Sequence, residues 1–250
     1  MSELTPGAVA VIALAVALGA FAKSVTGMGL PLVSVPVIAT FLGVETAVVV
    51  MALPTLVTNA WMLLAHRAGA SQTRDLPVLL TTGAVGVVVG TVILRTADPR
   101  WLALGLAIVI FAYLAMRILH PALVLPPSIT RRLSPFVGAA AGLAQGATGV
   151  SGPVVSTYVH AYRLPPSAFL FSTNALFQVF VTVQVAAFLV TGLYRGRVTH
   201  SLLALIPVAV VFPLGLGVGR RIDVKRFDAA ILALLFVSGL KQVADALGVF

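Results

Sequence analysis

The fold of this chain is decided by Lys23-Ser24-Val25-Thr26-Gly27-Met28-Gly29-Leu30-Pro31, a stretch that returns 122 positions later as Gln145-Gly146-Ala147-Thr148-Gly149-Val150-Ser151-Gly152-Pro153. When residues 22–37 are laid over residues 144–159 without a gap, seven of the sixteen positions are identical. The chain is therefore predicted to be a duplication, built from two homologous repeats.

Each copy interrupts a run of apolar residues with a small, polar, glycine-containing patch, and the run restarts at Pro31 or Pro153. Proline suits the first turn of a helix, where no backbone donor is lost, so each copy is predicted to be a broken helix. Inside a membrane, a break leaves peptide groups unpaired unless protein, water or a ligand satisfies them. Paired breaks in two halves are typical of a transporter's substrate site; tight helix packing at glycine and serine is the alternative.

The composition is that of a protein embedded in the lipid bilayer. Hydrophobic residues make up 60% of the 250 residues and charged residues only 9%, with a mean hydropathy of +1.09, whereas soluble domains are about a quarter charged. We therefore predict an all-α, polytopic transmembrane protein. The sequence contains no cysteine, which excludes disulfides and thiolate metal sites.

The net charge of +9 comes from basic residues at the ends of apolar segments. Membrane orientation and anionic headgroups account for them, and no basic stripe lies on a soluble face, so nucleic acid is not a predicted partner. The N-terminus has no basic residue ahead of its apolar run. It is predicted to be an uncleaved first span with Thr5 as N-cap and Pro6 at the first helical position.

The apolar segments fall into two series of five. We expect a first transmembrane repeat over residues 1–120, a linker over 121–132 and a second repeat over 133–250, with about eight to ten membrane segments in all. The expected segments are 6–26, 31–42, 46–65, 77–94 and 101–119, and then 133–147, 153–162, 166–191, 201–219 and 228–248.

Two topologies follow from the short segments after the breaks. If each broken element crosses once, the halves are parallel, and Lys and Arg divide eight against seven with Lys23 left in the break. If the short segments cross separately, the halves are inverted, and the basic residues divide eleven against five. The positive-inside rule favours the inverted layout.

Two further patterns lie within the spans. Thr58-Asn59-Ala60 matches Thr173-Asn174-Ala175, seven residues closer to the break in the second half, and this match predicts that the two asparagines occupy corresponding positions. Glycines recur at helical spacing at 83, 86 and 90 and at 215, 217 and 219. Such spacing predicts packing seams between helices.

The ionisable residues give no sign of an enzyme. All seven acids and all four histidines lie at or near segment ends, and no metal-ligand spacing or Ser/His/Asp arrangement is present. We therefore predict no catalytic residue, no metal site and no cofactor. A carboxylate relay for protons, of the kind that pumps use at mid-membrane, has no obvious residue.

The polar residues that remain at depth suit a small anion. Helices that begin at the two breaks direct their N-terminal amides toward a ligand, threonine and asparagine side chains add donors, and glycine lets an oxyanion approach the backbone. Lys23 either attracts the anion and carries coupling charge or extends toward the interface. Because backbone carbonyls alone can bind sodium, a sodium site is only partly excluded. The candidate substrate-binding residues are Ser24, Thr26, Gly27, Met28, Gly29, Asn59, Gln145, Thr148, Gly149, Ser151, Gly152, Asn174 and Gln178.

The paired motifs TGMGLP and TGVSGP, at residues 26–31 and 148–153 of a two-repeat chain of 250 residues, resemble those of the TauE/SafE sulfite exporter family, also called the 4-toluene sulfonate uptake permease family. Leu30 and Ser151 stand where that family often has glycine. The resemblance implies transport of sulfite, sulfonates, sulfoacetate or related anions across a bacterial inner membrane. It implies site roles for the motif positions Thr26, Gly27, Gly29 and Pro31, and Thr148, Gly149, Gly152 and Pro153.

The predicted function is secondary transport of a small organic or sulfur oxyanion, by alternating access around two facing breaks. Proton coupling, if present, would rest on Lys23 or on the substrate itself. An anion-selective channel lined by the two helix ends is one alternative. A membrane subunit that assembles with an enzyme without transporting anything is another.

Overall fold

A computed structural model describes residues 5–119, 124–218 and 224–248, and the regular elements within these ranges are helical without strands. The all-α prediction is therefore confirmed. The helices are α1 (Pro6–Thr26), α2 (Leu30–Leu42), α3 (Val44–Ala65), the 3-10 helix η1 (Arg67–Gln72), α4 (Leu76–Thr96), α5 (Pro99–Leu119), α6 (Pro127–Thr148), α7 (Gly152–His160), α8 (Pro166–Thr191), α9 (Val198–Leu203), α10 (Leu205–Val218) and α11 (Val224–Ala246).

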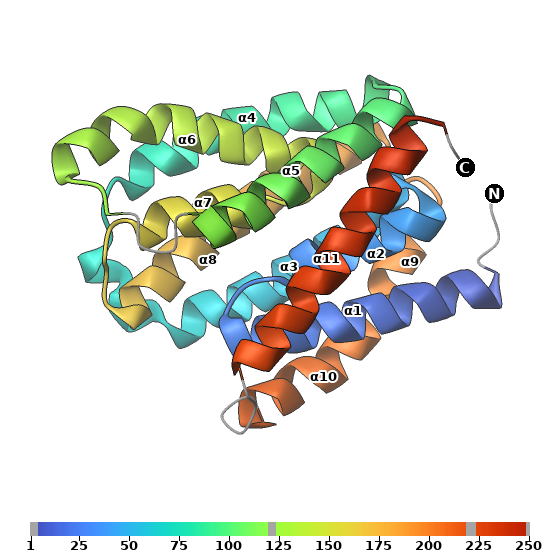
Figure 1. Cartoon of the computed structure of the whole chain (residues 1–250), viewed down its shortest axis with the longest axis horizontal. Helices are drawn as coiled ribbons and strands as arrows, with labels where there is room; N and C mark the ends of the chain where they lie inside the picture. Colours follow the sequence, from blue (N-terminus) through green and yellow to red (C-terminus); the bar gives the residue numbers. More distant parts are fainter. Residues whose placement is uncertain (1–4, 120–123, 219–223, 249–250) are drawn as a thin grey trace.

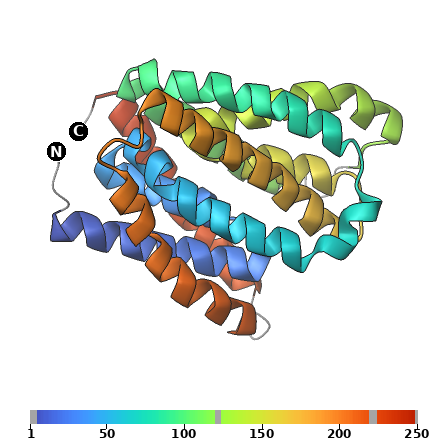
Figure 2. The same ribbon diagram turned by 180° about the vertical axis from the view of Figure 1, so that it is seen from behind.

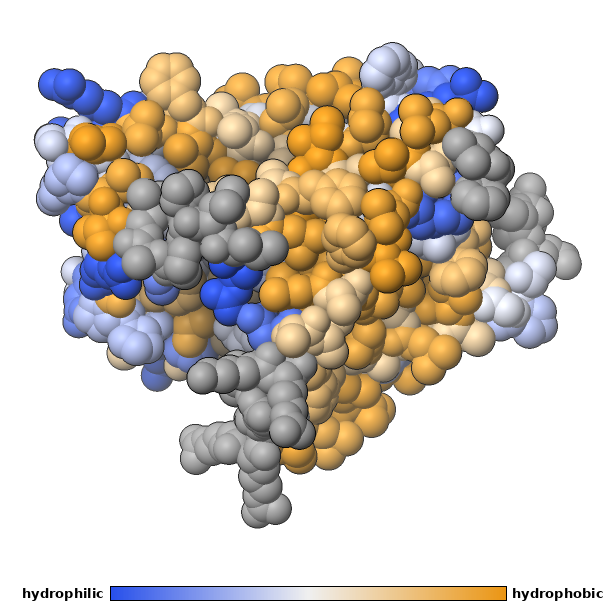
Figure 3. Space-filling model, viewed as in Figure 1, coloured by the Kyte–Doolittle hydropathy of each residue, from blue (hydrophilic) through white to orange (hydrophobic). Residues whose placement is uncertain are grey.

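Seven of the described segments are long and apolar enough to cross a membrane: α1, α3, α4, α5, α8, the continuous stretch Val198–Val218, and α11. Figure 1 shows the helices running mainly along the long axis of the molecule. Figure 3 shows a broad hydrophobic belt across the middle of the same face, with hydrophilic residues gathered toward the left and right ends. This distribution fits a multi-pass protein whose two ends meet water.

The chain stops being helical at both predicted breaks. α1 ends at Thr26, where Gly27 has a φ of 78° and donates its N–H to the Lys23 carbonyl at 2.7 Å. α6 ends at Thr148, where Gly149 has a φ of 70° and donates to the Gln145 carbonyl at 2.8 Å. The left-handed conformation disfavours residues with a Cβ, which explains the glycine that follows each threonine.

The first segment begins as predicted. Thr5 is the N-cap of α1, its Oγ1 accepts a hydrogen bond from the Ala8 N–H at 3.3 Å, and Pro6 follows it in the first turn. α6 differs, because it begins at Pro127. Six of the twelve residues assigned to the linker are therefore helical, since Pro126 and Pro127 start a helix instead of extending the connection.

Several helix boundaries of the two halves keep one constant spacing. Four boundaries of the first half have a counterpart one repeat length of 122 residues later. These pairs are Thr26 and Thr148, Leu30 and Gly152, Val44 and Pro166, and Leu76 and Val198.

The two asparagines do not follow that spacing. Asn59 and Asn174 are 115 residues apart, whereas α3 and α8 start 122 residues apart, so Asn174 lies seven residues closer to the start of its helix than Asn59 does. The prediction that they occupy corresponding positions is therefore wrong. The match of three residues around each asparagine is a local coincidence that the helix boundaries override.

α3 and α8 lie side by side and run in opposite directions. A Cβ added at Gly27 would meet Met62, near the end of α3, and Leu170, near the start of α8, whereas one at Gly149 would meet Val48, near the start of α3. The two breaks therefore lie toward opposite ends of this helix pair. Seen from behind in Figure 2, α8 lies between α3 and α4. Opposite directions are what inverted halves require, and inverted repeats remain our proposal for the chain.

Glycine seams hold the outer helices to the core. α4 contacts α6 along Gly83, Gly86 and Gly90, and a Cβ at Gly86 or Gly90 would lie 2.3 Å from a carbonyl oxygen of α6. Gly215 of α10 is equally tight against Ser24 of α1, while Gly217 has free space around it. The predicted seams are confirmed at Gly83, Gly86, Gly90 and Gly215, and residue 219 lies outside the described ranges.

Candidate functional site

A cavity of about 300 Å³ lies between the two breaks and is lined by both of them. α5 and α11, which cross the front of the molecule in Figure 1, supply one wall through Tyr113, Met116, Phe227 and Ile231. The volume is at the lower end of the range for small-molecule sites. The cavity is therefore large enough for an organic anion as well as for a small inorganic one.

At the first break, a buried cation faces the cavity. Lys23 lies one turn before the end of α1 and is only 1% exposed, and its ammonium group donates a hydrogen bond to Asn59 Oδ1 on α3. Asn59 is fully buried, and its Nδ2 has no hydrogen-bond partner among the described residues. Both side chains line the cavity. An unpaired buried amide is costly unless something fills its donors, so the pair is ready to receive a hydrogen-bond acceptor.

At the second break, the side chains form a closed, neutral network. Gln145 Nε2 donates to Gln184 Oε1 at 2.9 Å, and Ser151 Oγ donates to Gln145 Oε1 at 2.7 Å. Gln184 Nε2 in turn donates to the Gln145 carbonyl at 2.7 Å. All three residues are at most 4% exposed. Gln145 and Ser151 face the cavity, and Gln184 holds them from α8.

The mouth of the cavity lies where α1 and α5 end and α8 and α11 begin. Thr26, Arg117 and His160 are exposed lining residues at this end. Arg117 forms an ion pair with Asp228 at 2.6 Å, with the two side chains 50% and 27% exposed. Aromatic rings from α8 and α11 also line the cavity.

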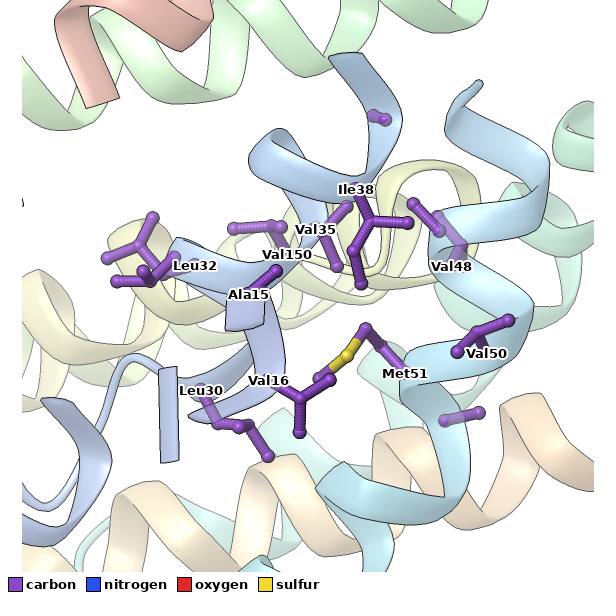
Figure 4. Close-up of a cluster of buried hydrophobic side chains, with 14 of the residues drawn as sticks. Ala15, Val16, Leu30, Leu32, Val35, Ile38, Val48, Val50, Met51 and Val150 are labelled. Atoms are coloured by element: carbon purple, nitrogen blue, oxygen red, sulfur yellow. The ribbon is translucent and has the colours of Figure 1, made fainter. Parts of the chain in front are cut away.

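Toward the end of the molecule opposite the mouth, apolar side chains close the cavity. Figure 4 shows Val35, Ile38, Val48 and Val150 beside one another, and each is at most 1% exposed. Val150 belongs to the second break, while the other three come from α2 and α3. Farther along, Glu45 at the start of α3 forms an ion pair with Arg197 at 2.5 Å. The cavity therefore opens toward one end of the molecule.

The structure brings eight of the fourteen candidate site residues together around the cavity. These are Lys23, Thr26, Met28, Gly29, Asn59, Gln145, Ser151 and Gly152. The other six lie outside its lining: Ser24, Gly27, Thr148, Gly149, Asn174 and Gln178.

Packing and local hydrogen bonds explain where those six residues lie. Ser24 packs against Gly215, and Gly27 and Gly149 are covered by side chains of α8 and α3. Asn174 donates to the Leu170 carbonyl at 2.9 Å and to the Gly27 carbonyl at 3.5 Å, so it supports the first break from behind. Gln178 lies half-buried on α8.

The two threonines use their hydroxyl groups within their own helices. Thr26 Oγ1 lies 2.9 Å from the Ala22 carbonyl, and Thr148 Oγ1 lies 2.8 Å from the Ala144 carbonyl. Thr26 Oγ1 is also 2.6 Å from the Met28 carbonyl and accepts from the Met28 N–H. Both hydroxyl groups therefore contact backbone carbonyls at the helix ends, and donation to a ligand by either threonine stays a prediction.

Sequence reasoning missed the wall formed by α5 and α11 and the role of Gln184. Tyr113, Arg117 and Asp228 come from segments that the duplication motif does not touch. One signal was available for Gln184, because glutamine in the middle of an apolar span needs a partner. The wall itself depends on contacts between distant helices, for which the sequence offers no local signal.

The described residues form a multi-pass helical protein whose two breaks share a cavity lined by a buried lysine. The sulfite exporter TauE/SafE family matches residues 11–242, nearly the whole chain. The chain belongs to this family of membrane anion transporters, and it is not an enzyme. Comparison with curated proteins and with solved structures gives no match.

Proposed function

We propose that the protein is a secondary transporter that binds one small organic or sulfur oxyanion, of the sulfite, sulfonate or sulfoacetate type, between its two breaks. The observation that carries this proposal is the buried Lys23–Asn59 pair, which offers a positive charge and an unfilled amide to the cavity. Charge-assisted hydrogen bonds to an anion are about twice as strong as neutral ones. An anion would also relieve the desolvation of the ammonium group.

The second break adds backbone donors. Ser151 occupies the N-cap position of α7 but makes no capping hydrogen bond, and its hydroxyl donates to Gln145 Oε1. The first amides of α7 are therefore free of a side-chain cap, and Gly152 lines the cavity. Helix N-termini attract negative charge. The anion would thus lie between the ammonium of one half and the helix end of the other.

Alternating access is the mechanism we favour over a channel. The apolar cluster of Val35, Ile38, Val48 and Val150 interrupts any continuous aqueous path beyond the second break, whereas a channel needs a continuous pore. Rocking of the halves would open that side and close the mouth at Arg117 and Asp228. By the positive-inside rule we assign the mouth, which lies at the arginine-rich end, to the cytoplasmic side.

Proton coupling remains a hypothesis. Among the described acids, Asp228 alone lines the cavity, and it is paired with Arg117 at the mouth. A proton would therefore be carried by Lys23 or by the substrate itself. If a pH gradient drives the same anion flux in Lys23→Gln as in the wild type, Lys23 does not carry the coupled proton.

The proposal is tested by thermal unfolding of the purified protein with sulfite, methanesulfonate and acetate. A ligand that binds the folded state raises stability by RT ln(1 + [L]/Kd). We expect at least one of these anions to raise the Tm of the wild type but not that of Lys23→Met, which keeps the side-chain length without the charge. Arg95→Gln, which removes an exposed cation at the far end of α4, is the control and should respond like the wild type. An equal response in Lys23→Met would contradict the proposal, as would ligand binding that never saturates.

A further inference from the structure

The second break carries polar side chains that anion binding does not use, and their orientation can be worked out. Gln184 Nε2 lies 2.7 Å from the Gln145 carbonyl and 3.4 Å from the Gly146 carbonyl. A carbonyl oxygen accepts hydrogen bonds and never donates them. The NH₂ group of Gln184 must therefore face these two oxygens, and its Oε1 must face Gln145.

This orientation fixes the next two groups in turn. Because Gln184 presents Oε1, Gln145 must donate its Nε2, which it does at 2.9 Å. Gln145 Oε1 then faces Ser151, and the Ser151 hydroxyl donates its single proton to it at 2.7 Å. With that proton committed, Ser151 Oγ can only accept a further hydrogen bond.

The cavity therefore has two unlike poles. At the first break the ammonium group of Lys23 and the Nδ2 of Asn59 are donors, whereas at the second break Ser151 Oγ is an acceptor. Lys23, Asn59 and Ser151 all line the same cavity. A bare anion satisfies the first pole and places an oxygen lone pair against the second.

We propose that the site selects an anion that also carries a hydrogen-bond donor, such as a hydroxyl group, an N–H group or the proton of an acid anion. The anionic oxygens face Lys23 and Asn59, and the donor faces Ser151 Oγ. Gln184 acts as a positioning residue, because it fixes the amide of Gln145 and hence the direction of the serine proton. This inference rests on the proposed function and narrows its substrate class.

The test compares two ligands of the same size. Hydroxymethanesulfonate carries a hydroxyl group at the position where ethanesulfonate carries a methyl group, and the two are otherwise identical. Their affinities can be measured by isothermal titration calorimetry. A net hydrogen bond contributes about five- to tenfold in affinity. The wild type should therefore prefer hydroxymethanesulfonate by about that factor.

Variants distinguish a ligand preference caused by the Ser151 acceptor from one caused by the shape of the site. Ser151→Ala should reduce the preference to less than about twofold, and Ser151→Thr, which keeps the hydroxyl, should retain it. Gln184→Leu should also reduce the preference, because Gln145 is then free to turn and Ser151 can donate its proton to a ligand. A purely structural role of Gln184 would weaken both ligands equally and leave their ratio unchanged.

The outcomes distinguish this inference from the proposed function. If both ligands bind the wild type equally, or if Ser151→Ala keeps the full preference, the acceptor pole is refuted while anion transport stands. If hydroxymethanesulfonate, ethanesulfonate and sulfite all fail to bind, the proposed function itself is refuted. A preference for hydroxymethanesulfonate that disappears in Ser151→Ala and survives in Ser151→Thr supports the inference.

Discussion

The two breaks share a backbone but differ in polarity. In both, a threonine hydroxyl contacts the carbonyl four residues earlier, a left-handed glycine caps the helix, and a new helix starts three residues later. The residue three positions before the threonine is Lys23 in one half and Gln145 in the other. The first carries charge to an unfilled amide, and the second completes a neutral network.

This difference shows how a duplicated scaffold can serve a single ligand. Two buried ammonium groups around one small cavity would repel each other strongly, because charges interact far more strongly in a protein interior than in water. One cation with one neutral partner suits a monoanion. The backbone that the two breaks share thus provides two helix ends, while the side chains determine the charge and hydrogen-bonding groups at each end.

Placing a second charge at the other break should have the largest effect. Gln145→Lys would add an uncompensated cation beside Lys23 and break the network with Gln184 and Ser151. We expect the unliganded protein to lose about 3–5 kcal/mol of stability, and a divalent anion such as sulfite to restore more Tm than it adds to the wild type. Thermal unfolding with and without sulfite measures both effects. Wild-type stability without ligand would show that the two breaks tolerate the same charge.

The outer contacts of the two halves differ as well, and Gly142 tests that difference. A Cβ at Gly142 of α6 would lie 1.9 Å from the Gly83 carbonyl of α4, whereas the residue 122 positions earlier, in α1, is Ala20. Gly142→Ala should therefore destabilise the protein by about 1–3 kcal/mol through overpacking. Gly217→Ala, where a Cβ meets nothing within 4 Å, should leave the Tm unchanged or raise it slightly, because alanine favours a helix more than glycine does. Equal effects of the two substitutions would refute the seam.

The threonines should behave alike in both halves. Thr148→Val removes a hydrogen bond to the Ala144 carbonyl and no cavity contact, so we expect a loss of about 1 kcal/mol in stability and an affinity for the anion within twofold of the wild type. Thr26→Val loses the bond to Ala22 and a side chain that lines the mouth of the cavity. Because its hydroxyl contacts the backbone carbonyls of Ala22 and Met28, we expect its affinity also to stay within twofold of the wild type. A tenfold loss of affinity in either variant would mean that its hydroxyl reaches the ligand after all.

The smallest effect is expected at the mouth of the cavity, where Arg117 and Asp228 form an exposed ion pair. Asp228→Asn leaves Arg117 without its partner and removes a negative charge from the entrance. The initial rate of anion uptake into proteoliposomes should rise about twofold at low salt, and the gain should vanish at high salt because the field is screened. A gain that persists at 1 M salt would exclude an electrostatic cause.

The parts of the site that the sequence predicts are those with local signals. Glycine and proline mark the two breaks to within a residue, because left-handed caps and first turns restrict residue type. The threonine hydroxyls could have been assigned to the backbone as well, since Ser and Thr in helices commonly bond the carbonyl four residues earlier. The correspondence of Asn59 with Asn174 is wrong because three identical residues are a weaker signal than the constant spacing of the helix starts, and a role of Asn174 in binding stays a prediction.

The remaining parts depend on packing between distant helices. Arg117 and Asp228 lie 111 residues apart and meet only because α5 contacts α11. Gln184 reaches Gln145 because α8 lies against the second break. Hydropathy places such helices in the membrane but does not fix their neighbours or the faces that they present.

The central claim is that the two breaks hold one anion in a shared cavity, and cysteine protection tests it most directly. The chain has no cysteine of its own, so Met28→Cys reports on the first break and Gly152→Cys, where a Cβ meets nothing within 4 Å, reports on the second. If the two breaks share one anion, a membrane-impermeant thiol reagent should label both cysteines from the side of Arg117, and the substrate anion should protect both with the same half-maximal concentration. Labelling from opposite sides, or protection of one cysteine alone, would contradict that claim.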